Sequence, residues 1–279
     1  MTIKAILLDL DGTTLKPNKI NISPENQAAI QNALQRGIKV IPCTGRVLDM
    51  FPADLENIKG IEYAVTCHGG RVLDLTGSAP KSLYQNLISV EKSVEILEII
   101  ENKGIYCEVA AANTIYMEKE IWQNWKNYPV PAHHVWYLEQ KRGLGVDCLS
   151  RYFKENGLEI NKVNIYGMAE ALQADIYQRL NATGAIRHTN EGVGPDLEFS
   201  AAAICKKEAV QVLLRHLNIL PEEAMIIGDS SSDVELIRWL GWGVAMGNAP
   251  DWIKQDADSV TLPCQENGVA AAINQVLEG

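Results

Sequence analysis

Two carboxylates stand two residues apart directly after a short, largely apolar run. The segment DLDGTTL spans Asp9 to Leu15, and residues 3–8 precede it. From average residue usage, a D-x-D-G-T pattern arises by chance in a chain of this length with a probability on the order of a few in a thousand. A calcium loop is excluded because its sixth and twelfth positions are Thr14 and Ile20, where Gly and Glu are required. The pair therefore indicates a functional site rather than an acidic turn.

A second acidic pair lies in GDSSSD, Gly228 to Asp233, again after a short apolar run. Alone, this segment is equally well explained as a capped helix with an acidic first turn. If both pairs follow strands of one parallel sheet, four carboxylates converge: Asp9, Asp11, Asp229 and Asp233. Two unit charges 4 Å apart repel by about 4 kcal/mol at an effective dielectric constant of 20, so a cation is required. Oxygen ligands and few carboxylates favour Mg²⁺ over a calcium site.

A phosphate group would need local donors, because the formal charge of the chain is −10. Thr44 and Gly45 follow another predicted strand and offer a hydroxyl and an unhindered N–H group, although, taken alone, a simple strand-ending turn explains them better. A phosphate site here would also need a local cation from a nearby lysine or arginine.

Helical periodicity predicts different directions for two neighbouring lysines, Lys206 and Lys207. Lys206 shares one stripe with Val210, Leu213 and Leu217, which places it on the inward side of its helix. Lys207 is rotated by about 100° and is expected to face solvent.

Strands and helices alternate around these motifs. Strands are predicted at residues 3–8, 38–42, 62–67 and 225–228, and helices from Pro24 to about Arg36, at 206–217 and at 231–239. Further elements fill the middle of the chain: helices near 90–103, 146–155 and 170–180, and strands at 105–110, 114–118 and 162–166. We therefore predict an α/β fold, in which a Rossmann-like, doubly wound parallel-sheet core (1–81 and 188–279) carries an inserted α/β cap domain (82–187).

The composition of the chain limits the classes of partner that are expected. The chain has 279 residues, 47% of them hydrophobic, and no run of Lys or Arg, so nucleic acid is not an expected partner. The six cysteines show no metal-ligand spacing and are expected to be reduced. The apolar run Ala5 to Leu8 is too short for a signal peptide or a membrane span. A cytoplasmic location and no membrane partner are the expectation, and the oligomeric state stays open.

The motifs, taken in order, resemble those of the haloacid dehalogenase superfamily: DLDGTTL, Thr44-Gly45-Arg46, Lys206 and GDSSSD. The large insertion, VAMGNAP at 244–250 and NGVAAAI at 267–273 resemble the Cof-like sugar phosphatase branch. This resemblance implies a mobile cap, Mg²⁺ and hydrolysis of small phosphorylated metabolites, sugar phosphates above all, through an aspartyl-phosphate.

The resemblance also implies residue roles. Asp9 would be the nucleophile and a metal ligand, Asp11 the acid/base with its carbonyl on the metal, and Asp229 the remaining protein ligand. Asp233 would support these ligands from behind. The phosphoryl group would be held by the following groups: the Leu10 backbone N–H, Thr44, Gly45, Lys206 and Ser232. A carboxylate that attacks a phosphate dianion needs such positive charge to offset repulsion.

Three residues depart from the family pattern: Ser232 replaces the usual Asn, His68 stands where Asn-Gly is common, and Lys207 replaces a Gly. These departures motivate one alternative, a catalytically weak Mg²⁺ and phosphometabolite-binding protein. A sugar phosphotransferase is a further alternative that stays open. The pair His133-His134 and the tryptophans nearby are expected in a core or interface more than at a substrate, as are Arg187 and His188.

Overall fold

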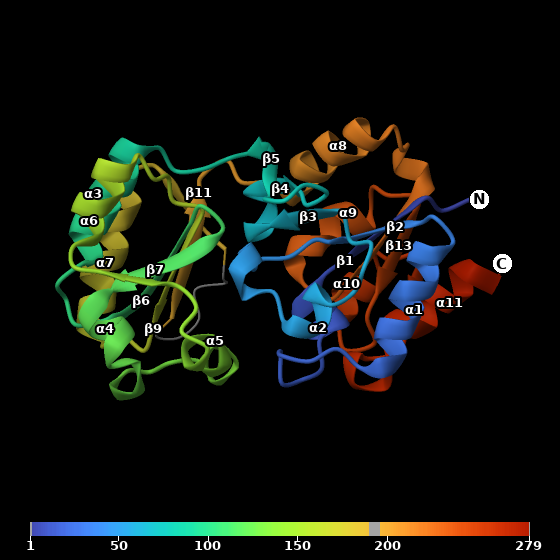
Figure 1. Ribbon diagram of the computed structural model, residues 1–279, viewed down its shortest axis with the longest axis horizontal. Coiled ribbons are helices and arrows are strands. Elements are labelled where there is room, and N and C mark those ends of the chain that lie inside the picture. The colour runs from blue at the N-terminus through green and yellow to red at the C-terminus, as the bar shows by residue number, and fades with distance from the viewer. Residues whose placement is uncertain (1, 190–195, 279) are drawn as a thin grey trace. The chain divides into compact units, whose positions relative to one another are not determined.

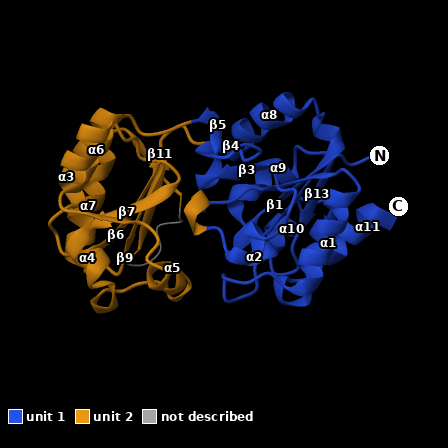
Figure 2. Ribbon diagram, viewed as in Figure 1, with its two compact units in different colours: residues 1–46, 51–85, 205–279 blue, residues 47–50, 86–204 orange. Residues whose placement is uncertain are grey.

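The computed structural model describes residues 2–189 and 196–278, which form two compact units (Figure 2). Unit 1 comprises the chain up to Arg46, Phe51–Gln85 and everything from Cys205 onward. Unit 2 comprises Val47–Met50 and Asn86–Ile204. The α/β architecture predicted from the sequence is confirmed.

A five-stranded parallel sheet forms the centre of unit 1, in the order β14-β13-β12-β1-β2. Its strands are β1 (Ala5–Leu8), β2 (Lys39–Pro42), β12 (Ala224–Gly228), β13 (Trp242–Ala245) and β14 (Ser259–Val260). Figure 1 labels three of these strands, β1, β2 and β13. Every residue of β1 and β12 is buried, as expected for central strands that are covered on both faces. Because all five strands run parallel, their carboxyl ends meet at one edge of the sheet.

Helices cover both faces of this sheet. They are α1 (Pro24–Gln35), α2 (Ala53–Glu56), α8 (Lys206–Leu217), α9 (Val234–Ile237), α10 (Asp251–Lys254) and α11 (Gly268–Glu278). Side chains of α8, α9 and α10 pack on the face to which Leu7 points. Ile6 and Leu8 point to the opposite face by strand alternation, and there α1 and α11 pack against each other. The predicted start of α1 is confirmed, since the Ser23 side chain accepts a hydrogen bond from the Asn26 N–H.

The strand predicted at 62–67 does not join the parallel sheet. As β3 (Tyr63–Thr66), it pairs antiparallel with β4 (Arg71–Asp74), which pairs with β5 (Lys81–Gln85). A single parallel bridge joins it to the end of β2. Cys67 (φ 51°), His68 (φ 55°) and Gly69 (φ 93°) adopt left-handed conformations, and the chain folds back there as a hairpin.

The helix predicted at 231–239 is present, but its first turn is tighter than an α-helix. Residues Ser231–Asp233 form a single 3₁₀ turn, and α9 follows it. The Asp233 carboxylate accepts hydrogen bonds from the Ser230 N–H and hydroxyl, which tightens this first turn.

Unit 2 is built on a six-stranded sheet in the order β10-β11-β9-β6-β7-β8. Its strands are β6 (Tyr106–Ala111), β7 (Thr114–Glu118), β8 (Leu144–Val146), β9 (Lys162–Tyr166), β10 (Ile186–His188) and β11 (Leu197–Ala201). Its helices are α3 (Val90–Ile100), α4 (Lys119–Gln123), α5 (Val135–Glu139), α6 (Leu149–Asn156) and α7 (Glu170–Ala182). Only β7 and β8 pair in parallel among these neighbours.

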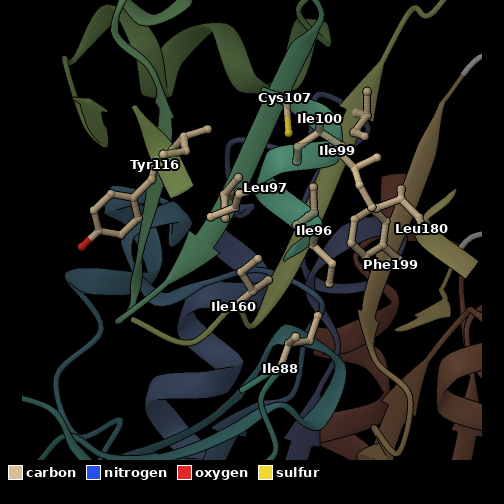
Figure 3. Close-up of a cluster of buried hydrophobic side chains, with 14 of the residues drawn as sticks. Ile88, Ile96, Leu97, Ile99, Ile100, Cys107, Tyr116, Ile160, Leu180 and Phe199 are labelled. Carbon is tan, nitrogen blue, oxygen red and sulfur yellow. The ribbon is translucent and has the colours of Figure 1, made fainter. Parts of the chain in front are cut away.

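One face of this sheet is apolar and carries the core of unit 2. Ile96 and Leu97 of α3 and Leu180 of α7 pack on Cys107 and Phe199 of the sheet (Figure 3). Helix α6 contributes to the same cluster. Because these apolar side chains are removed from water within unit 2 itself, the unit has a hydrophobic core of its own.

The limits of the two units differ from the predicted boundaries 82–187. Strand β5 pairs with β4, so unit 1 continues to Gln85. Strand β11 pairs with β9, so unit 2 continues to Ile204. All six cysteines lie in the described part of the chain and are free thiols, as predicted.

A four-residue strap, Val47–Met50, belongs to unit 2 although the chain on both sides of it belongs to unit 1. The Asp49 N–H donates to the Asn113 carbonyl (3.0 Å), and the Asp49 carboxylate accepts from the Thr114 hydroxyl (2.7 Å). The Asp49 carbonyl accepts from Arg142 (3.0 Å).

Candidate active site

The predicted site residues come together at the carboxyl edge of the parallel sheet in unit 1. Asp9 directly follows β1, Thr44 lies just after β2 and Asp229 directly follows β12. Strands β12, β1 and β2 are neighbours in the sheet. The order of these strands therefore converts separated sequence motifs into one cluster.

Three carboxylates form the centre of this cluster. One oxygen from each of Asp9, Asp229 and Asp233 lies within 4.8 Å of the others. Burial, followed by repulsion from Asp233, raises the pKa of Asp9 well above its ordinary value, although Lys206 partly offsets this. Burial is also the main reason that the pKa of Asp229 rises to about 6. Ionising all three groups is costly without further positive charge.

The donor set fits a hard divalent cation. Its ligand atoms are carboxylate oxygens only, which suit Mg²⁺ better than a soft transition metal. No other group of three acidic, histidine or cysteine side chains within residues 2–189 and 196–278 meets the same distance criterion. The side chain of Asp11 lies outside this group, and the expectation for Asp11 concerned its backbone carbonyl.

Lys206 supplies the buried positive charge. Its ammonium lies 2.6 Å from Asp233 Oδ1, 3.3 Å from Ser232 Oγ and 3.5 Å from Asp9 Oδ1. Burial alone would lower its pKa, but attraction to Asp233 and Asp9 outweighs burial and raises it. Helix α8 begins at this residue and buries Val210 and Leu213 on the same stripe, as predicted. Lys207 instead packs over the Trp239 ring, 5.5 Å from its centroid.

The turn after Asp9 depends on a glycine. Residues Leu10–Thr14 form this turn, Gly12 has φ +80°, and the Thr14 hydroxyl donates to the Asp9 carbonyl (2.6 Å). A Cβ atom at Gly12 would lie 2.2 Å from Asp229 Oδ2. Only glycine therefore allows both this backbone conformation and so close an approach to the carboxylate.

Two residues that sequence reasoning did not assign also hold Asp229. The Thr13 hydroxyl donates to Asp229 Oδ1 (3.0 Å), and Asn248 Nδ2 donates to Asp229 Oδ2 (3.2 Å) and to the Gly12 carbonyl (2.8 Å). A signal existed, because Asn248 follows β13, another strand that ends at this edge.

A third unassigned contact joins Asp11 to Arg46. Arg46 Nε donates to Asp11 Oδ2 and Arg46 Nη2 to Asp11 Oδ1, both at 2.7 Å. Arg46 Nη2 also donates to the Lys19 carbonyl (2.6 Å). The arginine side chain is only 6% exposed. Two loops of neighbouring strands are thus joined by a forked, charge-assisted contact.

The predicted phosphate loop is compact. Thr44 is buried, its N–H donates to the Val65 carbonyl (2.9 Å) and its hydroxyl accepts from the Arg46 N–H (3.2 Å). A Cβ atom at Gly45 would lie 2.4 Å from the His68 ring, so this ring packs directly over the glycine. Ser232 Oγ lies 2.9 Å from Ser230 Oγ.

Of the histidine pair in unit 2, His134 is buried, whereas His133 is half-buried. The contacts of His134 are those of a core residue. Its Nδ1 is 2.9 Å from Glu108 Oε1, which also accepts from the Tyr106 hydroxyl (2.7 Å). Burial opposes ionisation of Glu108, but His134 and these hydrogen bonds outweigh it and lower its pKa. His188 stacks on Tyr177, with ring centroids 4.5 Å apart.

Comparisons with known proteins agree with this geometry. The sequence profile of the haloacid dehalogenase-like hydrolases matches residues 6–273. Phosphatase YwpJ of Bacillus subtilis is 28% identical, over 99% of this chain and 100% of the relative. The 5-amino-6-(5-phospho-D-ribitylamino)uracil phosphatase YcsE of the same organism is 26% identical, over 97% of this chain and 94% of the relative.

A solved structure shares the fold. The crystal structure of a haloacid dehalogenase-like hydrolase from Bacteroides thetaiotaomicron superposes with a TM-score of 0.81, covers 99% of this chain and 100% of its own, and is 24% identical. In the described residues, no helix is both long and apolar enough to span a membrane. The profile match over nearly the whole chain confirms the resemblance seen in the motifs. The chain therefore belongs to the haloacid dehalogenase-like hydrolases and is a phosphatase of their Cof-like branch.

Proposed function

We propose that this protein is a Mg²⁺-dependent phosphomonoesterase that hydrolyses small phosphorylated metabolites, with sugar phosphates favoured, through an aspartyl-phosphate on Asp9. The observation that carries the proposal is the cluster of Asp9, Asp229 and Asp233 with the ammonium of Lys206 beside it. The substrate named for the relative YcsE, a phosphorylated ribitylamino compound, supports a polyol-like leaving group.

In this proposal, Asp9 and Asp229 hold the cation, with the Asp11 carbonyl as a further ligand. The bound cation supplies positive charge that offsets the repulsion between Asp9 and a phosphate dianion. The single positive charge of Lys206 offsets part of the negative charge of Asp233 and Asp9, which favours ionised Asp9 when substrate binds. Asp233 keeps Lys206 in place through the 2.6 Å ion pair.

The first half-reaction transfers the phosphoryl group to Asp9. An Asp9 carboxylate oxygen forms a bond to phosphorus while the bond from phosphorus to the ester oxygen breaks. Asp11 gives a proton to the departing alkoxide, which leaves as an alcohol. Phosphate oxygens would be held by the Leu10 N–H, Thr44, Gly45, Lys206 and Ser232.

The second half-reaction returns the enzyme to its starting state. Water attacks phosphorus, Asp11 accepts a proton from it, and the bond between phosphorus and Asp9 breaks. Inorganic phosphate is released and the Asp9 carboxylate is restored. One residue therefore serves as acid and then as base.

A direct test measures phosphate release from p-nitrophenyl phosphate and a panel of sugar and polyol phosphates, with Mg²⁺ and with EDTA. We expect Mg²⁺-dependent release and none from Asp9→Asn. A single turnover in ¹⁸O-labelled water should place the label in phosphate, whereas labelled Asp9 after several turnovers would contradict water attack at phosphorus. Ligand-induced stabilisation without phosphate release would favour a binding protein. Product formation that requires a second sugar would favour a phosphotransferase.

A further inference from the structure

The Asp11–Arg46 contact has the geometry of an orienting device. A planar guanidinium meets a carboxylate with two parallel bonds of 2.7 Å, from Nε and Nη2. Such a fork fixes the plane and direction of the carboxylate, which a lysine ammonium cannot do. The Asp11 side chain is 33% exposed, whereas that of Arg46 is 6% exposed. The buried partner therefore holds the accessible one.

Arg46 is itself held on two sides. Its backbone N–H donates to the Thr44 hydroxyl (3.2 Å), and its Nη2 donates to the Lys19 carbonyl (2.6 Å). Strands β1 and β2 are adjacent in the sheet, so the loops that carry Asp11 and Arg46 lie side by side. The position of the Asp11 side chain is therefore fixed by the loop after β2 as well as by its own turn.

We propose that Arg46 is a positioning residue for Asp11, and that it sets how well Asp11 assists the departure of strongly basic leaving groups. The inference rests on the proposed function, in which Asp11 passes a proton to the leaving oxygen. Each carboxylate oxygen has two lone pairs. The fork to Arg46 uses one lone pair on each oxygen, so the second lone pair of either oxygen can still exchange a proton. Proton transfer demands a defined distance and direction, and both follow from the fork.

The competing explanation is that Arg46 binds the phosphoryl group of the substrate. Its position after Thr44 and Gly45 suits this explanation, but its guanidinium donates to Asp11 and Lys19, and Lys206 is the cation next to Asp9. The two explanations predict different kinetics. A phosphate ligand affects every ester alike, whereas a residue that acts through Asp11 affects esters according to their leaving group.

The test compares p-nitrophenyl phosphate with phenyl phosphate, two aryl esters that differ by one nitro group, which makes the leaving oxygen less basic. The variants are Arg46→Met, which removes the charge and the fork, and Arg46→Lys, which keeps the charge only. We expect both variants to lower kcat/KM for phenyl phosphate at least tenfold more than for p-nitrophenyl phosphate. The inhibition constant for inorganic phosphate should change less than twofold.

Separate outcomes identify separate failures. If the wild type releases phosphate from neither ester, the proposed function fails. If the wild type cleaves both and each variant slows both by the same factor, the positioning role is overturned. A rise of tenfold or more in the inhibition constant for phosphate overturns it in favour of phosphate binding. Full rescue of the leaving-group ratio by Arg46→Lys shows that charge alone suffices and also overturns it.

Discussion

In the metal-free protein, the Asp229 carboxyl group should make the free energy of unfolding fall as the pH rises. Its pKa rises from 3.8 to about 6, mainly because the group is buried. Repulsion from Asp233 raises the pKa further, whereas the hydrogen bond from Thr13 lowers it. A carboxyl group with a higher pKa in the folded state stabilises that state fully below about pH 4. This contribution is lost as the pH rises through about 6. A difference of about two pH units corresponds to about 3 kcal/mol.

Replacing Asp229 by Asn should remove this pH dependence. The side chain stays neutral at every pH and keeps one oxygen for the Thr13 hydroxyl, but its amide group replaces the oxygen that accepts from Asn248. The free energy of unfolding of Asp229→Asn at one pH therefore reflects both the lost charge and the changed hydrogen bond. The difference in pH dependence between the wild type and this variant reflects only the titration of Asp229. Between pH 4 and 7.5, the wild type should lose about 3 kcal/mol relative to Asp229→Asn.

Urea unfolding in EDTA, followed by circular dichroism at several pH values, measures this slope. Asp251→Asn is the matched control, because it makes the same change on a side chain that is 92% exposed. We expect this control to follow the wild type. Excess Mg²⁺ should stabilise the wild type at pH 7.5 more than Asp229→Asn. Parallel pH curves for the wild type and Asp229→Asn would refute the reasoning.

Three further changes give distinct expected outcomes. Lys206→Ala should lower kcat/KM by roughly a hundredfold or more, because its ammonium lies next to Asp9, whereas Lys207→Ala should change it only a fewfold; a larger loss at Lys207 would contradict the assignment. Asp9→Asn should abolish turnover and raise the stability of the metal-free protein by about 1–3 kcal/mol, measured by urea unfolding, since carboxylate repulsion is relieved; a less stable variant would argue against that repulsion. Gly12→Ala should weaken Mg²⁺ binding, measured calorimetrically, because its Cβ would displace the Asp229 carboxylate; unchanged affinity would show that the turn can adjust.

Part of the site was predictable because it depends on local pattern. A strand that ends at an acidic residue indicates the sheet edge, which is why the sequence pattern placed Asp9 and Asp229 at the edge where the structure has them. Helical spacing places Lys206 inward, since a helix has one buried stripe.

The rest depended on long-range geometry. The fork between Arg46 and Asp11 requires a rotamer and the separation of two loops, and neither leaves a periodic signal in the sequence. The limit of unit 2 at Ile204 depends on the pairing of β11 with β9, a register set by the whole sheet. His68 and Gly69 have left-handed backbone conformations, and only for the glycine does the residue type predict such a conformation.

The strap Val47–Met50 constrains how this protein can exchange parts with its relatives. The chain passes between the two units four times, after residues 46, 50, 85 and 204, rather than the two times of a simple insertion. A recombination event that replaces only 86–204 would supply a foreign surface to Asp49, whose present partners are Asn113, Thr114 and Arg142. We expect chimaeras that also carry the donor's residues 47–50 to express and unfold cooperatively more often than those that do not, and to acquire the donor's ranking of esters. Two separated stretches of the gene, one of them only four codons long, would then have to be exchanged together to transfer a substrate range.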